Sequence, residues 1–279
     1  MRVHHLSCGS FCPYGRRLVN GEGSLLATGE IVCHCLAIET DDGLVLIDTG
    51  FGIGDANNRK QLGAYGPLLN LQISEGTTAL KQLEVLGFAA SDVRHIVATH
   101  LDLDHSGGLP DFPEAEVHLL AAEYEAAMHP IPRERLRYVG AHWTHHPRWV
   151  THGAGGDKWF GFESLRILPG IGTEIALVPL PGHTRGHTGV AIRTGEGWLL
   201  HAGDAYFHHE QMATPPSCPP LLRFFQTLTA SDNKVRKANG ERLRELAARH
   251  GDEITLICSH DPHELEREQA RAAHTAATA

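Results

Sequence analysis

The sequence predicts an α/β (α+β) protein in which short buried strands alternate with helices. Three observations lead to this prediction. The 279 residues are 42% hydrophobic and 20% charged, as in a globular protein with a substantial core. Several short stretches are apolar or alternate in the manner of strands, and segments 77–86 and 235–250 carry apolar residues at helical spacing. Strands followed by helices occur in two halves, so we expect one domain, residues 1–279, built as a pseudo-repeat divided near residue 165.

The first half is expected to begin with four strands. Residues 2–6 are typical of an edge strand, and residues 30–39 alternate as a half-buried strand does. The turn signal Asp41-Asp42-Gly43 joins this strand to an apolar one at 44–47, which predicts a hairpin. Residues 55–75 have the composition of an irregular exposed connection. The helix at 77–86 is expected to stop at Gly87, and a short buried strand covers residues 93–98.

The same alternation continues to the C-terminus. A strand at 116–120 precedes a short helix at 121–128. Residues 129–161 contain Trp143, Trp149 and Trp159 among prolines and glycines, and we expect an insertion over a site or a surface. Further strands are expected at 175–180, 188–193, 197–201 and 253–258, a proline-rich loop at 215–220, and helices at 235–250 and from 264 onward.

Charge and the absence of targeting signals narrow the class of protein. The net charge of −9 argues against a general nucleic-acid binder, which would carry a basic surface. No apolar run approaches the roughly 20 residues that span a bilayer, and the N-terminus lacks the apolar core of a signal peptide. We therefore expect a cytoplasmic protein that acts on a small molecule, without nucleic-acid or membrane partners. A homodimer is compatible with these features.

The cysteines do not indicate a metal site, whereas a cluster of histidines and aspartates does. The six cysteines do not have the separations of paired zinc knuckles, so we expect reduced and mostly buried thiols. The 21 histidines are too many for any single one to be a strong signal. A dense cluster is more informative: His100, Asp102, Asp104 and His105 lie within six residues, directly after the strand at 93–98.

Strand ends elsewhere in the chain carry the same kind of residue. Apolar strands end at His100, His183, Asp204 and His260. A strand end can hold a ligand with the precision that a metal ion requires, because the strand itself is rigid. Four such ends in one chain predict a metal site.

These motifs resemble those of the metallo-β-lactamase superfamily. The resemblance rests on LIDTG at 46–50, the ligand cluster at 100–105, PGHTRGHT at 181–188, GD at 203–204 and SH at 259–260. It covers most of the chain, and its layout is most similar to that of the N-acyl-homoserine lactonases. The resemblance implies an αββα sandwich, two mixed β-sheets flanked by helices, with a two-metal site along one edge.

The resemblance also implies a ligand set. His100 and His183 would hold one metal ion, and Asp204 would bridge both ions. The second ion would be held by Asp104, His105 and His260. Asp48 matches an aspartate that orients a ligand histidine in the superfamily, unless it simply caps its strand. His187 is expected to be a structural hydrogen-bonding residue.

One position departs from the family pattern, because Asp102 stands where a histidine is usual. Either Asp102 binds a metal ion, or it does not and only one ion binds well. We favour ligation, because a carboxylate at this spacing can reach the same ion. A third carboxylate makes the two-ion ligand set neutral and favours harder ions. We therefore expect two divalent ions, zinc first, with manganese or iron as alternatives.

The expected chemistry is hydrolysis of a lactone, an ester or a thioester by a hydroxide held between two metal ions. Asp104 would transfer protons. Tyr206 is either a second catalytic candidate or a packing residue, because the lactonases place their tyrosine three residues after the bridging aspartate, one position later. The alternative is a non-haem iron oxidoreductase, suggested by Asp102, and a binding protein without turnover is a third reading.

Candidates for the substrate pocket are less specific than the ligands. Leu221, Phe224 and Phe225 are candidates for an apolar wall against an acyl chain, together with the tryptophans of 129–161, or they are core residues. His208 and His209 are expected to be surface residues or to line the pocket.

Overall fold

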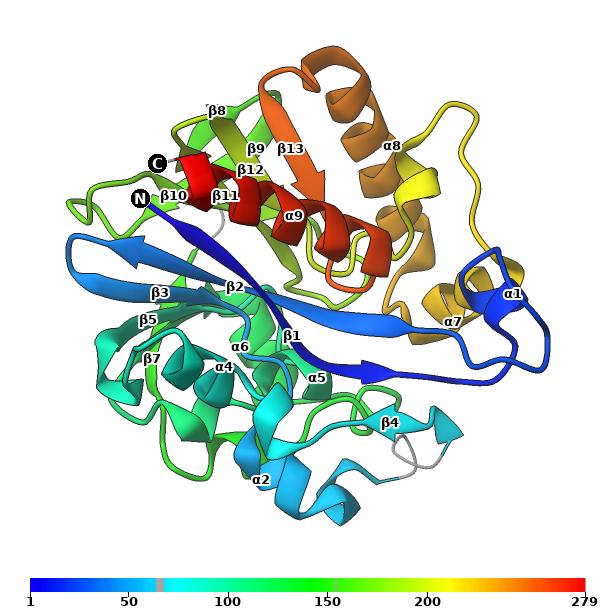
Figure 1. The fold of residues 1–279 in the computed structure, drawn as a ribbon, viewed down its shortest axis with the longest axis horizontal. Helices are drawn as coiled ribbons and strands as arrows, with labels where there is room; N and C mark the ends of the chain where they lie inside the picture. The colour runs from blue at the N-terminus through cyan, green and yellow to red at the C-terminus, as the bar shows by residue number, and fades with distance from the viewer. Residues whose placement is uncertain (64–67, 154, 279) are drawn as a thin grey trace.

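The computed structural model describes residues 1–63, 68–153 and 155–278, and its two β-sheets pack face to face with helices on their outer sides (Figure 1). The predicted αββα sandwich of mixed sheets is confirmed. Among the described residues, no helix has both the length and the apolar character needed to cross a membrane.

The first sheet has seven strands in the order β4-β1-β2-β3-β5-β6-β7. Its first four members pair antiparallel, and β3, β5, β6 and β7 pair parallel. The predicted hairpin of residues 30–47 is present as β2 and β3. The strands are β1 (Val3–Phe11), β2 (Ile31–Thr40), β3 (Gly43–Ile47), β4 (Leu71–Gln72), β5 (Val93–Val97), β6 (Glu116–Leu120) and β7 (Arg148–His152).

The second sheet has six strands in the order β13-β12-β11-β10-β9-β8. All its pairs are antiparallel except β12 with β13. The strands are β8 (Asp157–Trp159), β9 (Phe162–Ile167), β10 (Ile175–Pro179), β11 (Thr188–Thr194), β12 (Gly197–His201) and β13 (Ile254–Ile257). The chain passes from one sheet to the other between residues 152 and 157. The pseudo-repeat divided near residue 165 stays a prediction.

Helices occupy both outer faces of the sandwich. The α-helices are α1 (Arg16–Val19), α2 (Ile53–Asn57), α4 (Ala79–Val85), α5 (Leu103–Ser106), α6 (Ala121–Met128), α7 (Pro220–Thr229), α8 (Asn233–His250) and α9 (Pro262–Thr278). Leu83 of α4 and Ala126 of α6 pack against the first sheet, and Leu243 and Leu246 of α8 pack against the second. Between the sheets, Val45, Val97 and Ile175 belong to one fully buried cluster.

Several stretches differ from expectation. The connection at 55–75 was expected to be irregular and exposed, but its described part includes the end of α2 and the strand β4, with Leu71 buried. Residues 148–152 and 157–159, which we expected within an insertion, form β7 and β8 and so complete one edge of each sheet. Pro147 directly precedes β7 and Gly153 directly follows it, which conceals this strand in the sequence. The proline-rich loop ends at Pro219, and Pro220 begins α7, because proline fits the first turn of a helix. As expected, all six cysteines are free thiols, four of them buried.

Candidate metal centre

The predicted ligands converge because several strands end at the same edge of the sandwich. Asp48 follows β3, and His100 follows its parallel neighbour β5. Asp204 and His260 follow β12 and β13, which are also parallel to each other. His183 comes four residues after β10. All five side chains are buried at this edge.

The first group of side chains surrounds a space the size of one ion. The Nε2 atom of His183 lies 3.0 Å from Oδ2 of Asp102 and 3.3 Å from Oδ2 of Asp204. The Nε2 atom of His100 lies 3.6 and 3.8 Å from the same two oxygens. Ligand atoms about 2.1 Å from a tetrahedral ion are about 3.4 Å apart, so this spacing suits a bound cation.

A second group lies on the other side of Asp204. Oδ2 of Asp104 is 3.7 Å from Nε2 of both His105 and His260. Oδ1 of Asp204 is 3.3 Å from His105 Nε2, and its Oδ2 is 3.1 Å from His260 Nε2. Asp204 therefore lies between the two groups. The structure thus brings together all seven candidate metal ligands that the sequence suggested.

Several atoms in this centre have unmet bonding capacity. His100 Nε2, His105 Nε2 and Asp204 Oδ1 are buried and have no hydrogen-bond partner within the described part of the chain. Leaving a buried polar atom unpaired costs about 1–3 kcal/mol each, so a cluster of them is unfavourable without a ligand. The nitrogen and oxygen donors fit divalent ions of the zinc class.

Asp48 fixes the direction of two of these imidazoles. Its Oδ2 accepts hydrogen bonds from His105 Nδ1 at 2.8 Å and from Thr99 Oγ1 at 2.7 Å. Thr99 Oγ1 lies 2.9 Å from His100 Nδ1. Both rings therefore turn Nε2 toward the centre, as an orienting carboxylate does in metal sites. Asp48 has a φ of 56°, a strained backbone conformation that is held in place by these contacts.

His187 supports the candidate metal centre through hydrogen bonds and is not placed as a ligand. Its Nδ1 donates to the carbonyl oxygen of Leu180 at 2.8 Å, and its Nε2 accepts from the backbone N–H of Asp204 at 2.8 Å. With both ring nitrogens used, His187 positions Asp204 and has no lone pair left for a metal ion.

Arg137 is a residue of the centre that the sequence did not reveal. Its Nε lies 3.4 Å from Oδ1 of Asp102, and its Nη1 donates to the carbonyl oxygen of His183 at 3.0 Å. Burial opposes ionisation of Asp102, but the charges of Arg137 and His100 outweigh it and hold the pKa of Asp102 well below its usual range. No local pattern marks Arg137, because only the fold brings this residue to the edge where the candidate ligands lie.

Tyr206 does not reach the centre, contrary to expectation. Its side chain is fully buried in the core behind the second sheet, and its hydroxyl donates to Oε1 of Glu264 at 2.9 Å. The next residue, Phe207, faces the centre instead, with its ring centroid 4.4 Å from that of His260. Phe207 is three residues after Asp204, the position of the lactonase tyrosine, and it has no hydroxyl to offer a substrate.

A small pocket of about 50 Å³ opens on the centre. Asp102, Asp104, Asp204, His183, His260 and Arg137 form its polar part. Its apolar part is formed by Phe11, Ile31, Leu69, Leu103, Phe207 and Phe225.

Only one of the expected wall residues lines this pocket. Phe225 does so, whereas Phe224 is 62% exposed and Leu221 is 38% exposed on the outer side of α7. The three tryptophans belong elsewhere: Trp143 and Trp149 pack against the core of the first sheet, and Trp159 lies in the core behind the second.

His208 and His209 lie beside the start of α9. His208 is buried, with Nε2 3.4 Å from the carbonyl oxygen of Asn20, and His209 is only partly exposed. His209 pairs with Asp261 through Nδ1 at 2.7 Å. Neither histidine is among the residues described around the pocket.

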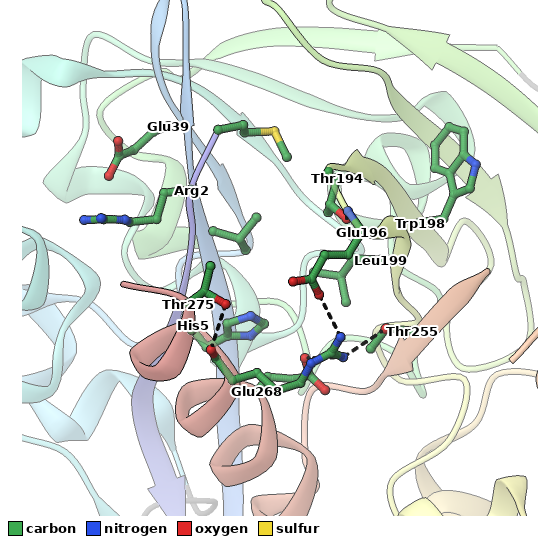
Figure 2. A pocket seen from close by; sticks show the side chains of 15 residues that line it. Arg2, His5, Glu39, Thr194, Glu196, Trp198, Leu199, Thr255, Glu268 and Thr275 are labelled. Atoms are coloured by element: carbon green, nitrogen blue, oxygen red, sulfur yellow. Dashed lines mark hydrogen bonds and ion pairs between the residues drawn. The ribbon is translucent and has the colours of Figure 1, made fainter. Parts of the chain in front are cut away.

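A larger hollow, of about 590 Å³, lies between α9 and the strands of both sheets (Figure 2). Arg271 pairs there with Glu196 at 2.8 Å and with Glu268 at 3.4 Å. None of the candidate ligands is among its described lining residues. The hollow is therefore separate from the candidate metal centre, and Arg271, Glu196 and Glu268 are already paired with one another.

Comparison with known proteins places these features in a family. A model of the metallo-beta-lactamase superfamily matches residues 28–249. A probable metallo-hydrolase of Mycobacterium tuberculosis is 43% identical over 97% of this chain and 84% of its own length. An N-acyl homoserine lactonase of Bacillus thuringiensis is 28% identical over 72% of this chain and 76% of its own.

Solved structures of lactonases share the fold. The AiiA lactonase of B. thuringiensis, with N-decanoyl-L-homoserine bound at the active site, superposes with a TM-score of 0.71 at 20% identity, covering 95% of each chain. AidC, a dizinc quorum-quenching lactonase, superposes with a TM-score of 0.62 at 17% identity, covering 93% of this chain and 87% of its own.

Proposed function

The chain belongs to the metallo-beta-lactamase superfamily, and from this premise we propose that this hydrolytic enzyme opens lactone rings at a centre of two divalent metal ions. The observation that carries the proposal is the convergence of buried histidines and aspartates, with unpaired ligand atoms, beside an apolar pocket. The relatives named as lactonases support the lactone as substrate. None of the comparisons supports the iron oxidoreductase alternative.

We assign the ligands as follows. His100, Asp102 and His183 hold one ion, and Asp204 is shared between the two. The other ion is held by Asp104, His105 and His260. One group of ligand atoms comes from His100, His183 and Asp204 and the other from Asp104, His105 and His260, each within 4.8 Å of one another, which supports this division. The assignment of Asp102 rests on its distance of 3.0 Å from His183.

Arg137 explains how the centre tolerates Asp102. Replacing a neutral histidine by an aspartate adds one negative charge to the ligand set. The guanidinium of Arg137, 3.4 Å from Asp102, adds one positive charge at the same place. In our proposal the pair together has the net charge of the histidine that it replaces. With the charge of Asp102 balanced by Arg137, the ligand set would not weaken the effect of bound ions on the pKa of water, and zinc is the expected metal.

Different residues of the chain have different roles in the proposed reaction. When bound, the two ions supply Lewis acidity for the substrate carbonyl and lower the pKa of a water molecule. The carboxylate of Asp104 accepts the proton of the attacking water and returns it to the ring oxygen as the C–O bond breaks. Phe207 and Phe225 cover the acyl chain, which excludes bulk water from the reacting carbonyl. Asp48 and His187 hold the ligands in position.

The Asp204→Asn variant tests the ligand assignment. Because Asp204 is shared by both ions, we expect the variant to lose most of its bound metal and more than about 100-fold in lactone hydrolysis. Elemental analysis and turnover of a panel of lactones, thioesters and phosphodiesters provide the two readouts. Asp252→Asn, at an exposed position, is the control and should change neither.

Two outcomes would contradict the proposal in different ways. An Asp204→Asn variant that keeps two ions per chain would refute the shared ligand. Turnover of thioesters or phosphodiesters without lactone turnover would refute the substrate class and leave the metal centre intact.

A further inference from the structure

Outside the candidate metal centre, another group of side chains able to bind a metal ion lies on the first sheet. His95 of β5, His118 of β6 and His152 of β7 form a row across three neighbouring parallel strands. Val97 and Leu120, two residues further along β5 and β6, belong to the core between the sheets, so the row lies on the inner face. His95 is the third of the five residues of β5, whereas His100 follows the end of this strand, and none of the three histidines is among the residues described around the pocket.

Three atoms of this group are arranged around one point. His95 Nδ1 is 3.1 Å from His118 Nε2, and Oε2 of Glu116 is 3.8 Å from the first and 3.9 Å from the second. From these three distances, the circle through the atoms has a radius of about 2.1 Å, which is a typical bond length from zinc to imidazole nitrogen or carboxylate oxygen. A single cation can therefore bond all three atoms.

Hydrogen bonding alone accounts for only part of this arrangement. It explains the contact between the two imidazoles, but 3.8 and 3.9 Å are too long for hydrogen bonds to the carboxylate. The other oxygen of Glu116, Oε1, faces Arg148 Nη2 at 3.4 Å. Oε2 is thus left directed toward both imidazoles without bonding to either.

The contact between His118 and His152 leaves Nε2 of His118 without a proton, which is the state in which an imidazole nitrogen binds a metal ion. His118 Nδ1 contacts His152 Nε2 at 3.1 Å, so a proton on Nδ1 leaves the lone pair of Nε2 free. Oδ2 of Asp42 is 3.8 Å from the other nitrogen of His95, too far for a hydrogen bond, and adds a negative charge beside the ring.

We propose that His95, Glu116 and His118 form a third divalent-cation site, of the zinc class, with water completing the coordination. Two imidazoles and one carboxylate are a donor set that zinc accepts. The side chain of Glu116 is 37% exposed, so an ion enters from solvent. The bound ion cross-links β5 to β6 and stabilises the strand that leads to His100. This site is independent of the proposed function.

Zinc stoichiometry tests the site. The wild type and the double variant His95→Ala/Glu116→Gln are saturated with zinc, dialysed and measured by elemental analysis. The double variant should hold one zinc per chain fewer, whatever number the catalytic centre holds. His129→Ala, whose side chain is 78% exposed, is the control and should match the wild type. A far-ultraviolet circular dichroism spectrum equal to that of the wild type shows that the double variant is folded.

Two further variants keep the test decisive. In Asp204→Asn, zinc at the third site should remain and should disappear when His95→Ala/Glu116→Gln is added. If the double variant does not fold, Glu116→Gln alone should weaken binding of the last zinc more than about tenfold. Equal zinc content in the wild type and the folded double variant, or unchanged affinity in Glu116→Gln, would overturn the proposal.

Discussion

The pair formed by Asp102 and Arg137 can be tested by a double-mutant cycle on metal-free protein. Asp102→Asn and Arg137→Met each leave the partner buried without its counter-charge, which typically costs about 3–5 kcal/mol of folding free energy. Unit charges 3.4 Å apart interact by about 5 kcal/mol at an effective dielectric constant near 20. Because Arg137 also donates to the carbonyl of His183, we expect a smaller coupling energy of about 3 kcal/mol.

Urea unfolding at pH 7 with a chelator measures the four free energies of unfolding. The chelator removes bound ions, so the coupling reports the pair alone. Arg133→Met is the matched control: Arg133 lies in the same segment but is exposed and contacts only the carbonyl of Ser231 in the described structure, so we expect a change within about 0.5 kcal/mol. A coupling below about 1 kcal/mol would refute the reasoning that Arg137 balances the charge of Asp102.

Two other predictions follow from Glu264 and Phe225. Burial raises the pKa of Glu264 from its usual value of 4.5 to about 7. As the pH rises, Glu264 therefore loses its proton in the unfolded chain before it does so in the folded protein. The free energy of unfolding of the wild type consequently decreases between pH 4.5 and 7. Glu264→Gln removes this titration, and its stability relative to the wild type should increase by about 3 kcal/mol across that window in denaturant unfolding; a constant difference would contradict the raised pKa. Phe225→Ala should lower kcat/KM about tenfold more for long-chain than for short-chain acyl lactones, because Phe225 lines the pocket. Phe224→Ala, on the exposed side of α7, is its control, and an equal loss for both chain lengths would remove Phe225 from the acyl site.

Much of the sandwich and of the ligand set could be predicted from the sequence. Each ligand directly follows, or lies a few residues after, an apolar strand that is visible in the local pattern. His100 after β5 and His260 after β13 are examples. Because strand period and ligand type are both local properties, a single sequence can reveal them without knowledge of the tertiary contacts.

The sequence by itself therefore determined the strand ends and the kinds of atom that they carry. The tertiary structure alone decided that Arg137 meets Asp102, because the contact joins distant segments without a shared pattern. It also decided that Phe207 rather than Tyr206 faces the pocket, since the backbone after β12 sets which of two neighbouring side chains turns inward. The row of histidines on β5, β6 and β7 likewise depends on strand order and register, which act between strands and not within them.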